Sequence, residues 1–397
     1  MAVTAASFVG YMGFTIAMPF LPLYIEQLGV TSVAAVAWWS GVCLAITPAV
    51  TALLSPFWGR FADRYGKKIM IERSLISFVF FMALSAFVTD VRQLFAIRLV
   101  QGLFAGYGSL SIAMAAESAP PERLGPSIGA VQTAQRLGPA IGPAAGGLIA
   151  HVVGLRMAFL ITAALYAVAL GMIVALYRQP RALERQGEGA GRAVRFRNVL
   201  AFENFMVLMA AIFLLQFVDR SIGPILPLYL PMLGVASDQI ALVAGMAFSA
   251  VAVMAAVGHH LAGRLLHARP PRPIIAGGAV VAALGSVMAA GAGRTWHLMA
   301  GSCLFGVGIG SAMTAAYTAG GALLPEAAQG TGFGLLTSAS LIGMAASPFV
   351  AGVIAGVRLR TVFVVDAIIL GILVVLISRA MTGQYFVRHT AAAAEVP

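Results

Sequence analysis

Apolar stretches of about 20 residues recur along the whole chain, and short polar connectors separate them. An α-helix rises about 1.5 Å per residue, so each stretch is long enough to cross the ~30 Å hydrocarbon core of a bilayer. The pattern therefore predicts an all-α membrane protein with 12 transmembrane helices. The predicted spans cover residues 3–24, 34–57, 70–88, 92–116, 127–150, 157–177, 204–229, 239–262, 273–291, 297–319, 331–352 and 359–378.

A sequence repeat divides these spans into two sets of six. The stretch PFLPLYIEQLGV at residues 19–30 returns as PILPLYLPMLGV at residues 224–235, with eight of twelve positions identical. Because an even number of spans separates the copies, both cross the membrane in the same direction, as in a parallel repeat. The two prolines of each copy predict either a bend in that helix or its end. The predicted organisation is an N-terminal six-helix bundle (1–177), a cytoplasmic linker (178–200), a C-terminal six-helix bundle (201–380) and a cytoplasmic tail (381–397).

The charge of the chain follows the predicted membrane topology. The formal net charge is +11, yet 60% of the residues are hydrophobic and only 10% are charged. With the N-terminus inside, the inner connectors and tail hold 17 Lys/Arg and the outer connectors hold five, as the positive-inside rule requires. We therefore expect a multi-pass protein of the cell (inner) membrane, with both termini cytoplasmic and no nucleic-acid partner. The 17 are Arg60, Arg64, Lys67, Lys68, Arg73, Arg123, Arg178, Arg181, Arg185, Arg192, Arg195, Arg197, Arg264, Arg269, Arg272, Arg379 and Arg388.

Residue types that bind metals or form disulfides are few and scattered. Cys43 and Cys303 lie within apolar spans without paired spacing, which argues against a disulfide framework and a metal site. His259 and His260 end the eighth predicted span without a third ligand, so we interpret both as interfacial residues at the cytoplasmic face. The first span begins with neither a basic flank nor a cleavage site, so we expect no removed signal peptide.

The connector between predicted spans two and three reads GRFADRYGKK, at residues 59–68. Gly59 allows two helix ends to approach closely or the chain to turn sharply, an acid can cap a helix or pair with an arginine, and basic residues keep the loop inside. The alternative is an ordinary basic loop, which needs only the basic residues that keep it inside. The second copy reads GRLLHARPPR from residue 263, so the duplicated connector has diverged. The candidate gate residues are Gly59, Asp63, Arg64, Gly66, Lys67 and Lys68.

Predicted span four contains RLVQGLFAG, in which Arg98 and Gln101 share a helix face. An arginine within hydrocarbon costs at least ~2.5 kcal/mol on insertion scales, so it should face a bundle interior or an aqueous cavity. The alternative is an arginine that extends its head group to the nearby outer surface.

Predicted span five reads GAVQTAQRLGPAIGPAAGG and is rich in glycine. Gly138, Gly142 and Gly146 recur every four residues, which predicts a smooth stripe for a closely packed partner helix. The prolines at 139 and 143 remove backbone donors and should bend the helix. Gly129 lies on roughly the opposite face and is not part of the stripe.

Two further candidate sites lie within predicted spans. Arg136 should lie near the membrane midplane with Gln132 one turn away, where it either contacts a polar or anionic group in a cleft or bonds backbone carbonyls. In predicted span seven, Asp219 shares a face with Gln216, whereas Arg220 points about 100° away.

An acid in an apolar span is a candidate proton carrier. Hydrocarbon surroundings favour the neutral form of such an acid and a nearby cation favours the carboxylate, a competition that a proton carrier can use. The alternative for Asp219 is a fixed structural ion pair at the outer mouth. Other candidate acids are Glu26, at the outer end of span one, and Glu117, at the inner end of span four.

These motifs resemble those of the major facilitator superfamily, in particular its 12-helix drug:proton antiporter branch. Residues 59–68 resemble its loop motif, Gly-x-x-x-Asp-Arg-x-Gly-basic-basic, and Arg98 to Gly102 resemble its span-four motif, Arg-x-x-Gln-Gly. The resemblance implies that Asp63 and Arg64 belong to a charge network that steadies one closed conformation, and that Arg98 takes part in proton coupling. Span five resembles the antiporter motif, Gly-x8-Gly-x3-Gly-Pro-x2-Gly-Gly, through Gly129, Gly138, Gly142, Pro143, Gly146 and Gly147.

The resemblance implies a monomeric secondary active transporter rather than an enzyme. We expect proton-coupled efflux of drugs or other small amphipathic molecules by alternating access, driven by the proton gradient without a cofactor. A sugar or metabolite exporter, or a proton symporter, of the same fold remains an alternative. A polytopic membrane enzyme or receptor is a further alternative, but the sequence contains neither a His-Glu-x-x-His motif nor a nucleophile elbow.

Overall fold

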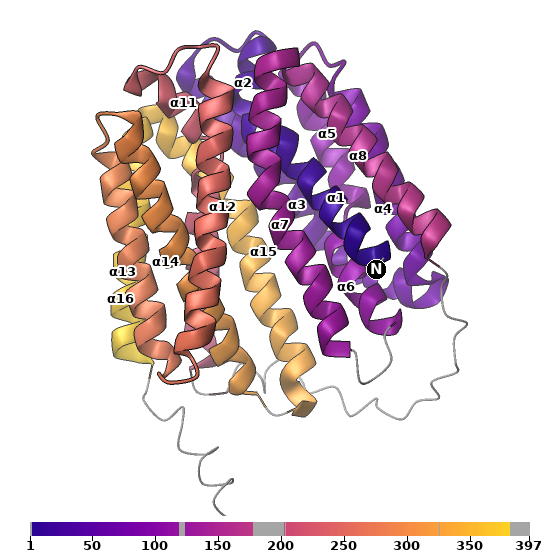
Figure 1. The fold of residues 1–397 in the computed structure, drawn as a ribbon, viewed down its shortest axis with the longest axis vertical. Coiled ribbons are helices and arrows are strands. Elements are labelled where there is room, and N and C mark those ends of the chain that lie inside the picture. Colours follow the sequence, from indigo (N-terminus) through magenta and orange to yellow (C-terminus); the bar gives the residue numbers. More distant parts are fainter. Residues whose placement is uncertain (1, 119–123, 178–201, 203, 325, 382–397) are drawn as a thin grey trace, which may run out of the picture.

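The computed structural model describes residues 2–118, 124–177, 202, 204–324 and 326–381, and the secondary structure of this part of the chain is helical (Figure 1). The predicted linker and nearly all of the predicted tail lie outside the described residues. The N-terminal half contains α1 (Ala2–Ala17), η1 (Met18–Phe20), α2 (Leu21–Gln27), α3 (Val33–Tyr65), α4 (Lys67–Ser85), α5 (Val91–Phe104), α6 (Tyr107–Ser118), α7 (Leu124–Val153) and α8 (Leu155–Leu176). The C-terminal half contains α10 (Phe205–Ser221), α11 (Leu226–Tyr229), η3 (Leu230–Leu233), α12 (Ile240–Leu265), α13 (Pro271–Ala290), α14 (Thr295–Ala322), α15 (Glu326–Val357) and α16 (Leu359–Ala380).

The helices account for the twelve predicted spans. Eight helices in the described part of the chain are long and apolar enough to cross a membrane, and α10 with α11 and η3 forms a ninth, bent span. The three other predicted spans appear as α4, the pair α5 and α6, and α7. These are shorter or richer in charged, polar and glycine residues, which lowers their hydropathy.

Successive spans alternate in direction, so the start of α1 and the end of α16 lie at the same face of the molecule. We call this the terminal face and the other the opposite face. The turns from α3 to α4 and from α12 to α13 lie at the terminal face, and the turns from α7 to α8 and from α15 to α16 lie at the opposite face.

The two halves are bundles that meet along two pairs of helices (Figure 1). In the N-terminal half α1 packs on α7 and α8, and α4 packs on α8. In the C-terminal half α14 packs on α12 and α13, and α16 packs on α13 and α10. Between the halves α3 packs on α15 and α7 packs on α12. Movement of one bundle against the other therefore involves these two interfaces.

The fourth predicted span is broken, although its hydropathy predicts a continuous helix. The chain changes direction between α5 and α6 at Gly106, whose φ of 139° strongly favours glycine. The carbonyl of Phe104 accepts hydrogen bonds from Arg73 Nη2 at 3.2 Å and from Ser74 Oγ at 2.8 Å, both on α4. These two donors take the place of the backbone N–H that would bond the Phe104 carbonyl in a continuous helix, and they stabilise the break.

The repeated prolines bend the first span of each half rather than end it. In the first copy a 3-10 turn at Met18–Phe20 joins α1 to α2, and both belong to one span of residues 2–27. In the second copy α10 and the segment Leu226–Leu233 differ in direction by 46°. The repeat is therefore more strongly bent in the C-terminal half.

Candidate functional site

The glycine stripe of α7 packs directly on α1, as its spacing predicts. A β-carbon at Gly138 would lie 2.6 Å from the backbone nitrogen of Met12, and β-carbons at Gly142 and Gly146 would also lie too close to α1. A β-carbon at Gly129 would have no neighbour within 4 Å, in agreement with its predicted place off the stripe. Glycine at the three stripe positions therefore permits backbone contact between α1 and α7.

A second face of α7 packs on α12 of the other half. A β-carbon at Gly147 would lie 2.5 Å from the Ala241 carbonyl oxygen, and one at Gly245 would overlap the Pro143 carbonyl oxygen. Because these residues lie near the opposite-face ends of α7 and α12, this crossing brings the halves together at that face.

The interface of α3 and α15 repeats this arrangement. A β-carbon at Gly352 would lie 2.5 Å from the Ala37 carbonyl oxygen, and one at Gly41 would overlap the Pro348 carbonyl oxygen. Both glycines lie near the opposite-face ends of their helices. The two crossings together hold the halves close at the opposite face.

A cavity of 530 Å³ lies at the opposite face, lined by the ends of α2, α3, α11, α12, α15 and α16. Glu26 and Arg358 are its charged lining residues. This volume is within the range of about 300–1,000 Å³ that is usual for small-molecule pockets. Glu26 is thus placed in a mostly apolar cavity between the halves.

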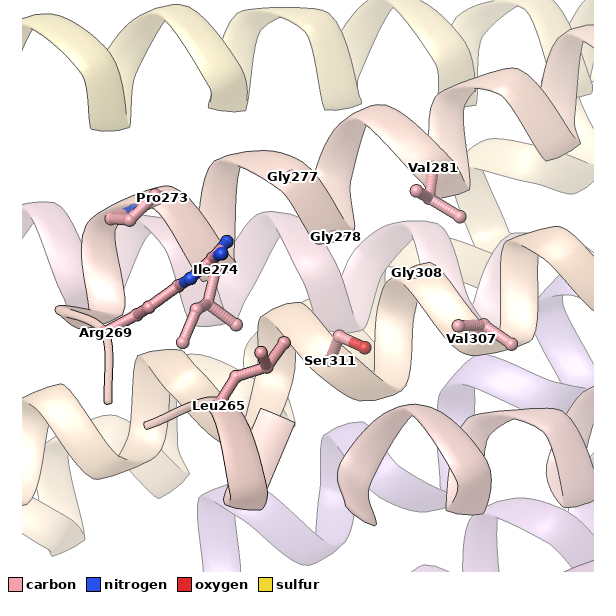
Figure 2. Close-up of a pocket in the computed structure, with 10 residues that line it drawn as sticks. All are labelled: Leu265, Arg269, Pro273, Ile274, Gly277, Gly278, Val281, Val307, Gly308 and Ser311. Carbon is pink, nitrogen blue, oxygen red and sulfur yellow. The ribbon is translucent and has the colours of Figure 1, made fainter. Parts of the chain in front are cut away.

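A smaller cavity, of 180 Å³, lies within the C-terminal half near the terminal-face ends of α12 to α14 (Figure 2). Gly277, Gly278 and Gly308 form part of its wall, and Arg269 lies beside it. It is below the usual size of a pocket for a drug-sized molecule.

Asp219 and Arg220 form an ion pair near the end of α10. Arg220 Nε lies 3.4 Å from Asp219 Oδ2, and the side chains are 49% and 26% exposed, respectively. The sequence argument placed these neighbours about 100° apart and left open whether Arg220 is the partner of Asp219. Arg220 is in the last turn of α10, where its long side chain can turn back towards the preceding residue.

The ion pair faces residues of the N-terminal half. Arg136, on α7, interacts electrostatically with Asp219, and Tyr11, on α1, does so with Arg220. Asp219 therefore interacts with two arginines that belong to different halves. We name these four groups and the neighbours described next the polar cleft.

Ser340 and Tyr317 belong to the polar cleft and were not predicted from the sequence. Gln216 Oε1 accepts a hydrogen bond from Ser340 Oγ, on α15, at 3.2 Å. Tyr317, on α14, interacts with Ser340 and with Arg136. Serine and tyrosine are common in apolar spans, so the sequence carried no signal that singled them out. The prediction that Gln216 and Asp219 share a face is consistent with their common position beside this group.

Arg136 connects the halves through a histidine rather than through backbone carbonyls. Its Nη1 lies 2.7 Å from His259 Nε2, on α12. The sequence indicated an interfacial position for His259 and did not predict this partner; α12 continues beyond it to Leu265. His260 and Gln132 are exposed.

Arg98 lies in a separate polar cluster inside the N-terminal half. It is 2% exposed, donates from Nη1 to Gln101 Oε1 at 3.0 Å and contacts Met18 Sδ with Nη2 at 2.8 Å. The alternative that its head group extends to the surface is therefore wrong. Within the described residues, Arg98 Nε and Gln101 Nε2 have no hydrogen-bond partner. Cys43 and Tyr166 are the titratable groups that interact with this guanidinium, so it is a buried cation beside uncharged groups.

The predicted gate loop is a single-residue turn. Gly66, with a φ of 93°, separates α3 from α4, and Gly59 lies inside α3. The turn is thus at Gly66 and not at Gly59, because α3 continues to Tyr65. Lys68 Nζ donates to the Tyr177 carbonyl at 2.8 Å and so ties α4 to the end of α8.

The structure describes only some of the side chains of the remaining loop residues and candidate acids. Arg64 is exposed, with its guanidinium 5.5 Å from the ring centroid of Tyr65. Lys67 begins α4. The side chains of Asp63 and Glu117 lie outside the described part of the structure. Among the described residues, no group of three or more His, Cys, Asp or Glu could hold a metal ion.

Two helical bundles with a charged cleft between them define a membrane transporter rather than an enzyme. The sequence profile described as Major Facilitator Superfamily matches residues 3–296 and 208–395. The chain therefore belongs to the Major Facilitator Superfamily, and this confirms the resemblance that its motifs indicate.

Curated relatives are similar over much of the chain. A protein of Lactococcus lactis named multi-drug resistance efflux pump PmrA homolog is 34% identical over 65% of this chain and 63% of its own length. A protein of Citrobacter koseri named multidrug resistance protein MdtG is 32% identical over 77% of this chain and 75% of its own length.

Solved structures share the fold. A bacterial homolog of the human lysosomal transporter Spinster, in an inward-facing and occupied conformation, superposes with a TM-score of 0.79 at 17% identity, over 96% of this chain and 95% of that one. A D-xylose-proton symporter superposes with a TM-score of 0.77 at 15% identity, over 96% of each chain. At these identities the likeness concerns the fold, and it confirms the predicted twelve-helix class.

Proposed function

We propose that this chain exports drugs or other small amphipathic molecules from the cytoplasm in exchange for protons. The observation that carries the proposal is the polar cleft, in which Asp219 of one half faces Arg136 of the other. Two observations support the proposal independently of the polar cleft. The glycines that resemble the antiporter motif lie on α7, which packs closely on both α1 and α12. The similar relatives are named as multidrug efflux proteins.

The proposed orientation places the terminal face in the cytoplasm. The connectors at that face, with the linker and tail, hold 17 lysines and arginines, against five at the opposite face. Positively charged loops remain preferentially on the cytoplasmic side of the membrane. The protein would then lie in the inner membrane as a monomer, with both termini inside.

The proposed mechanism is alternating access about the two glycine crossings. In the structure the crossings bring the halves together at the opposite face, so substrate enters the polar cleft from the cytoplasm. A carboxylate at Asp219 attracts a cationic or polar substrate, and protonation of Asp219 removes that attraction and weakens its pairing with arginine. Substrate and proton thus compete for the same group, and the competition couples their opposite movements.

The alternative is a sugar or metabolite exporter, or a proton symporter, of the same fold. Both alternatives use the same halves and cleft, and they differ in substrate or in the direction of proton movement. An antiporter moves protons against the substrate, and a symporter moves them with it. The direction of proton movement on substrate addition therefore separates antiport from symport.

Asp219→Asn tests the proposal in inverted membrane vesicles energised with a proton gradient. We expect the wild-type protein to release protons from the vesicle interior when a transported dye is added, because the cytoplasmic face is outside. Asp219→Asn should abolish this proton movement while the protein remains in the membrane. Asp238→Asn, on an exposed connector at the opposite face, is the matched control and should behave as the wild type.

Unchanged proton movement in Asp219→Asn would remove this acid from the mechanism. Proton uptake in the substrate's direction by the wild-type protein would instead establish symport. A panel of dyes and drugs, tested in cells that lack other exporters with and without a proton uncoupler, identifies the substrate for this assay.

A further inference from the structure

The contact between Arg136 and His259 determines which ring nitrogen carries a proton. Arginine has only N–H donors and no acceptor. Its Nη1 lies 2.7 Å from His259 Nε2, so the lone pair of Nε2 must accept this hydrogen bond. His259 Nε2 therefore carries no proton in this arrangement.

The other ring nitrogen faces an acceptor on α14. His259 Nδ1 lies 2.6 Å from Thr314 Oγ1. A neutral imidazole carries hydrogen on one of its two nitrogens, so with Nε2 as acceptor the hydrogen is on Nδ1, which donates to Thr314. The imidazole is thus neutral and in a single tautomer, with its basic nitrogen directed at the other half of the molecule.

The surroundings of the imidazole contain one charge in direct contact. Arg136 faces it from α7, and Thr314 and Tyr317 lie on the α14 side. Asp219, on α10, interacts with Arg136. His260, next along α12, is exposed. Among the described residues, His259 therefore meets the polar cleft through Arg136.

The position of the contact gives it access to water. The glycine crossing of α7 and α12 lies near the opposite-face ends of these helices, whereas His259 is near the terminal-face end of α12. Arg136 is exposed and His259 is half-buried. A proton can therefore reach Nε2 from the terminal face while the crossing remains closed.

We propose that Nε2 of His259 is a second proton-binding site of the transporter, an inference that rests on the proton-coupled exchange proposed above. A proton from water forms an N–H bond with the Nε2 lone pair, and the hydrogen bond from Arg136 Nη1 to that lone pair is lost. Imidazolium and guanidinium then face each other as like charges, which separates α7 from α12 at this level. Loss of the proton to water restores the lone pair and the contact. Proton and Arg136 thus compete for one pair of electrons at the interface between the halves.

Spin-label distances across this interface test the site. The labels are placed at the exposed positions Ala130, on α7, and Leu261, on α12, in a protein whose two cysteines are replaced by alanine. Histidine is the side chain that ordinarily changes charge between about pH 5 and pH 8. We expect the distance between the labels to increase on acidification, below the pH at which a free histidine gains its charge, because Arg136 opposes a second positive charge.

His259→Gln should remove that response without removing the contact. Its amide oxygen can accept the hydrogen bond from Arg136, but it does not bind a proton in this pH range. We expect a constant distance between the labels and one fewer proton moved per substrate than in the wild type. His260→Gln, at the exposed neighbouring position, should retain both wild-type properties.

Nitrogen-15 NMR of histidine-labelled protein gives a second readout that needs no variant to be active. The signal missing from His259→Gln identifies the residue, and we expect hydrogen on Nδ1 alone at about pH 8 and on both nitrogens after acidification. Hydrogen on Nε2 at high pH, or a wild-type distance response in His259→Gln, would overturn the inference while leaving Asp219-dependent exchange intact. A wild-type protein that shows the distance response but moves no protons with substrate would contradict the proposed function and leave this proton site in place.

Discussion

The two interfaces between the halves share their backbone arrangement. In one, Gly41 of α3 packs on the Pro348 carbonyl of α15, and in the other, Gly245 of α12 packs on the Pro143 carbonyl of α7. The positions correspond through the internal repeat, with offsets of 204 and 205 residues. Close backbone contact at both sites is therefore a property of the duplicated fold rather than of one half.

The side chains of the two interfaces differ. At the α7 and α12 interface Arg136 contacts His259, whereas the position equivalent to Arg136 at the other interface is Leu341. At the described positions, the α7 and α12 interface therefore combines the shared backbone contact with a charged contact, whereas the α3 and α15 interface has an apolar residue at position 341. The comparison indicates that the two duplicated interfaces share their backbone packing and differ in side-chain chemistry at this position.

The largest expected effect comes from filling the shared crossing. Gly41→Val and Gly245→Val each place side-chain atoms against a backbone carbonyl, and overpacking commonly costs about 1–3 kcal/mol. We expect both variants to lose export, since neither can close at the opposite face. Dye export from cells, normalised to the amount of protein in the membrane, measures the loss.

Gly171→Val, on α8, is the matched control for these two variants. A β-carbon there has no neighbour within 4 Å, so export should be unchanged. Loss of export in only one of the two crossing variants would contradict the view that the interfaces are mechanically equivalent.

A smaller effect is expected when the charged contact is converted to its apolar counterpart. Arg136→Leu installs the residue found at position 341 and removes a charged hydrogen bond, a type that contributes about 1.5–3 kcal/mol. We expect export to fall by about tenfold or more, the factor that corresponds to about 1.4 kcal/mol. Initial rates of dye efflux at several substrate concentrations measure it.

The control for this variant is Arg264→Leu, which changes an exposed arginine at the end of α12 and should leave export unchanged. In the double variant Arg136→Leu/Leu341→Arg we expect no recovery of export, because the imidazole that binds the arginine, His259, lies on α12. Recovery would show that either interface can carry the arginine and would end the distinction between them.

Features that follow from spacing along one helix were predicted from the sequence. The spans follow from hydropathy, and the stripe of Gly138, Gly142 and Gly146 follows from a four-residue period that places small residues on one helix face. The same period excluded Gly129 from the stripe. The break at Gly106 was missed because hydropathy does not register a backbone φ of 139°.

Features that depend on contact between distant segments were not predicted. His259 lies 123 residues from Arg136 along the chain, and nothing near it in sequence indicates an arginine partner. Tyr317 and Ser340 are residue types without a distinctive signal. The sequence left the pairing of Asp219 with Arg220 open for a local reason, since a 100° separation around the helix does not limit a long side chain at a helix end.

The smallest expected effect concerns the other polar contact of the α7 and α12 interface. The backbone N–H of Ala144 donates to Ser249 Oγ at 3.0 Å, whereas the equivalent of Ser249 in the first half is Ala45. Ser249→Ala therefore makes this position of the interface resemble its apolar counterpart. Hydrogen bonds between membrane helices average about 0.6 kcal/mol by double-mutant cycles. We expect a change of about threefold in the ratio of closed to open molecules, read from spin labels at the opposite-face ends of α7 and α12.

Ser338→Ala is the control for this variant. The Ser338 hydroxyl donates to the Gly334 carbonyl within its own helix, so its loss should leave that ratio unchanged. An effect of Ser249→Ala as large as that of Arg136→Leu would show that the interfaces differ mainly in this neutral hydrogen bond, and that the arginine and histidine contact is secondary.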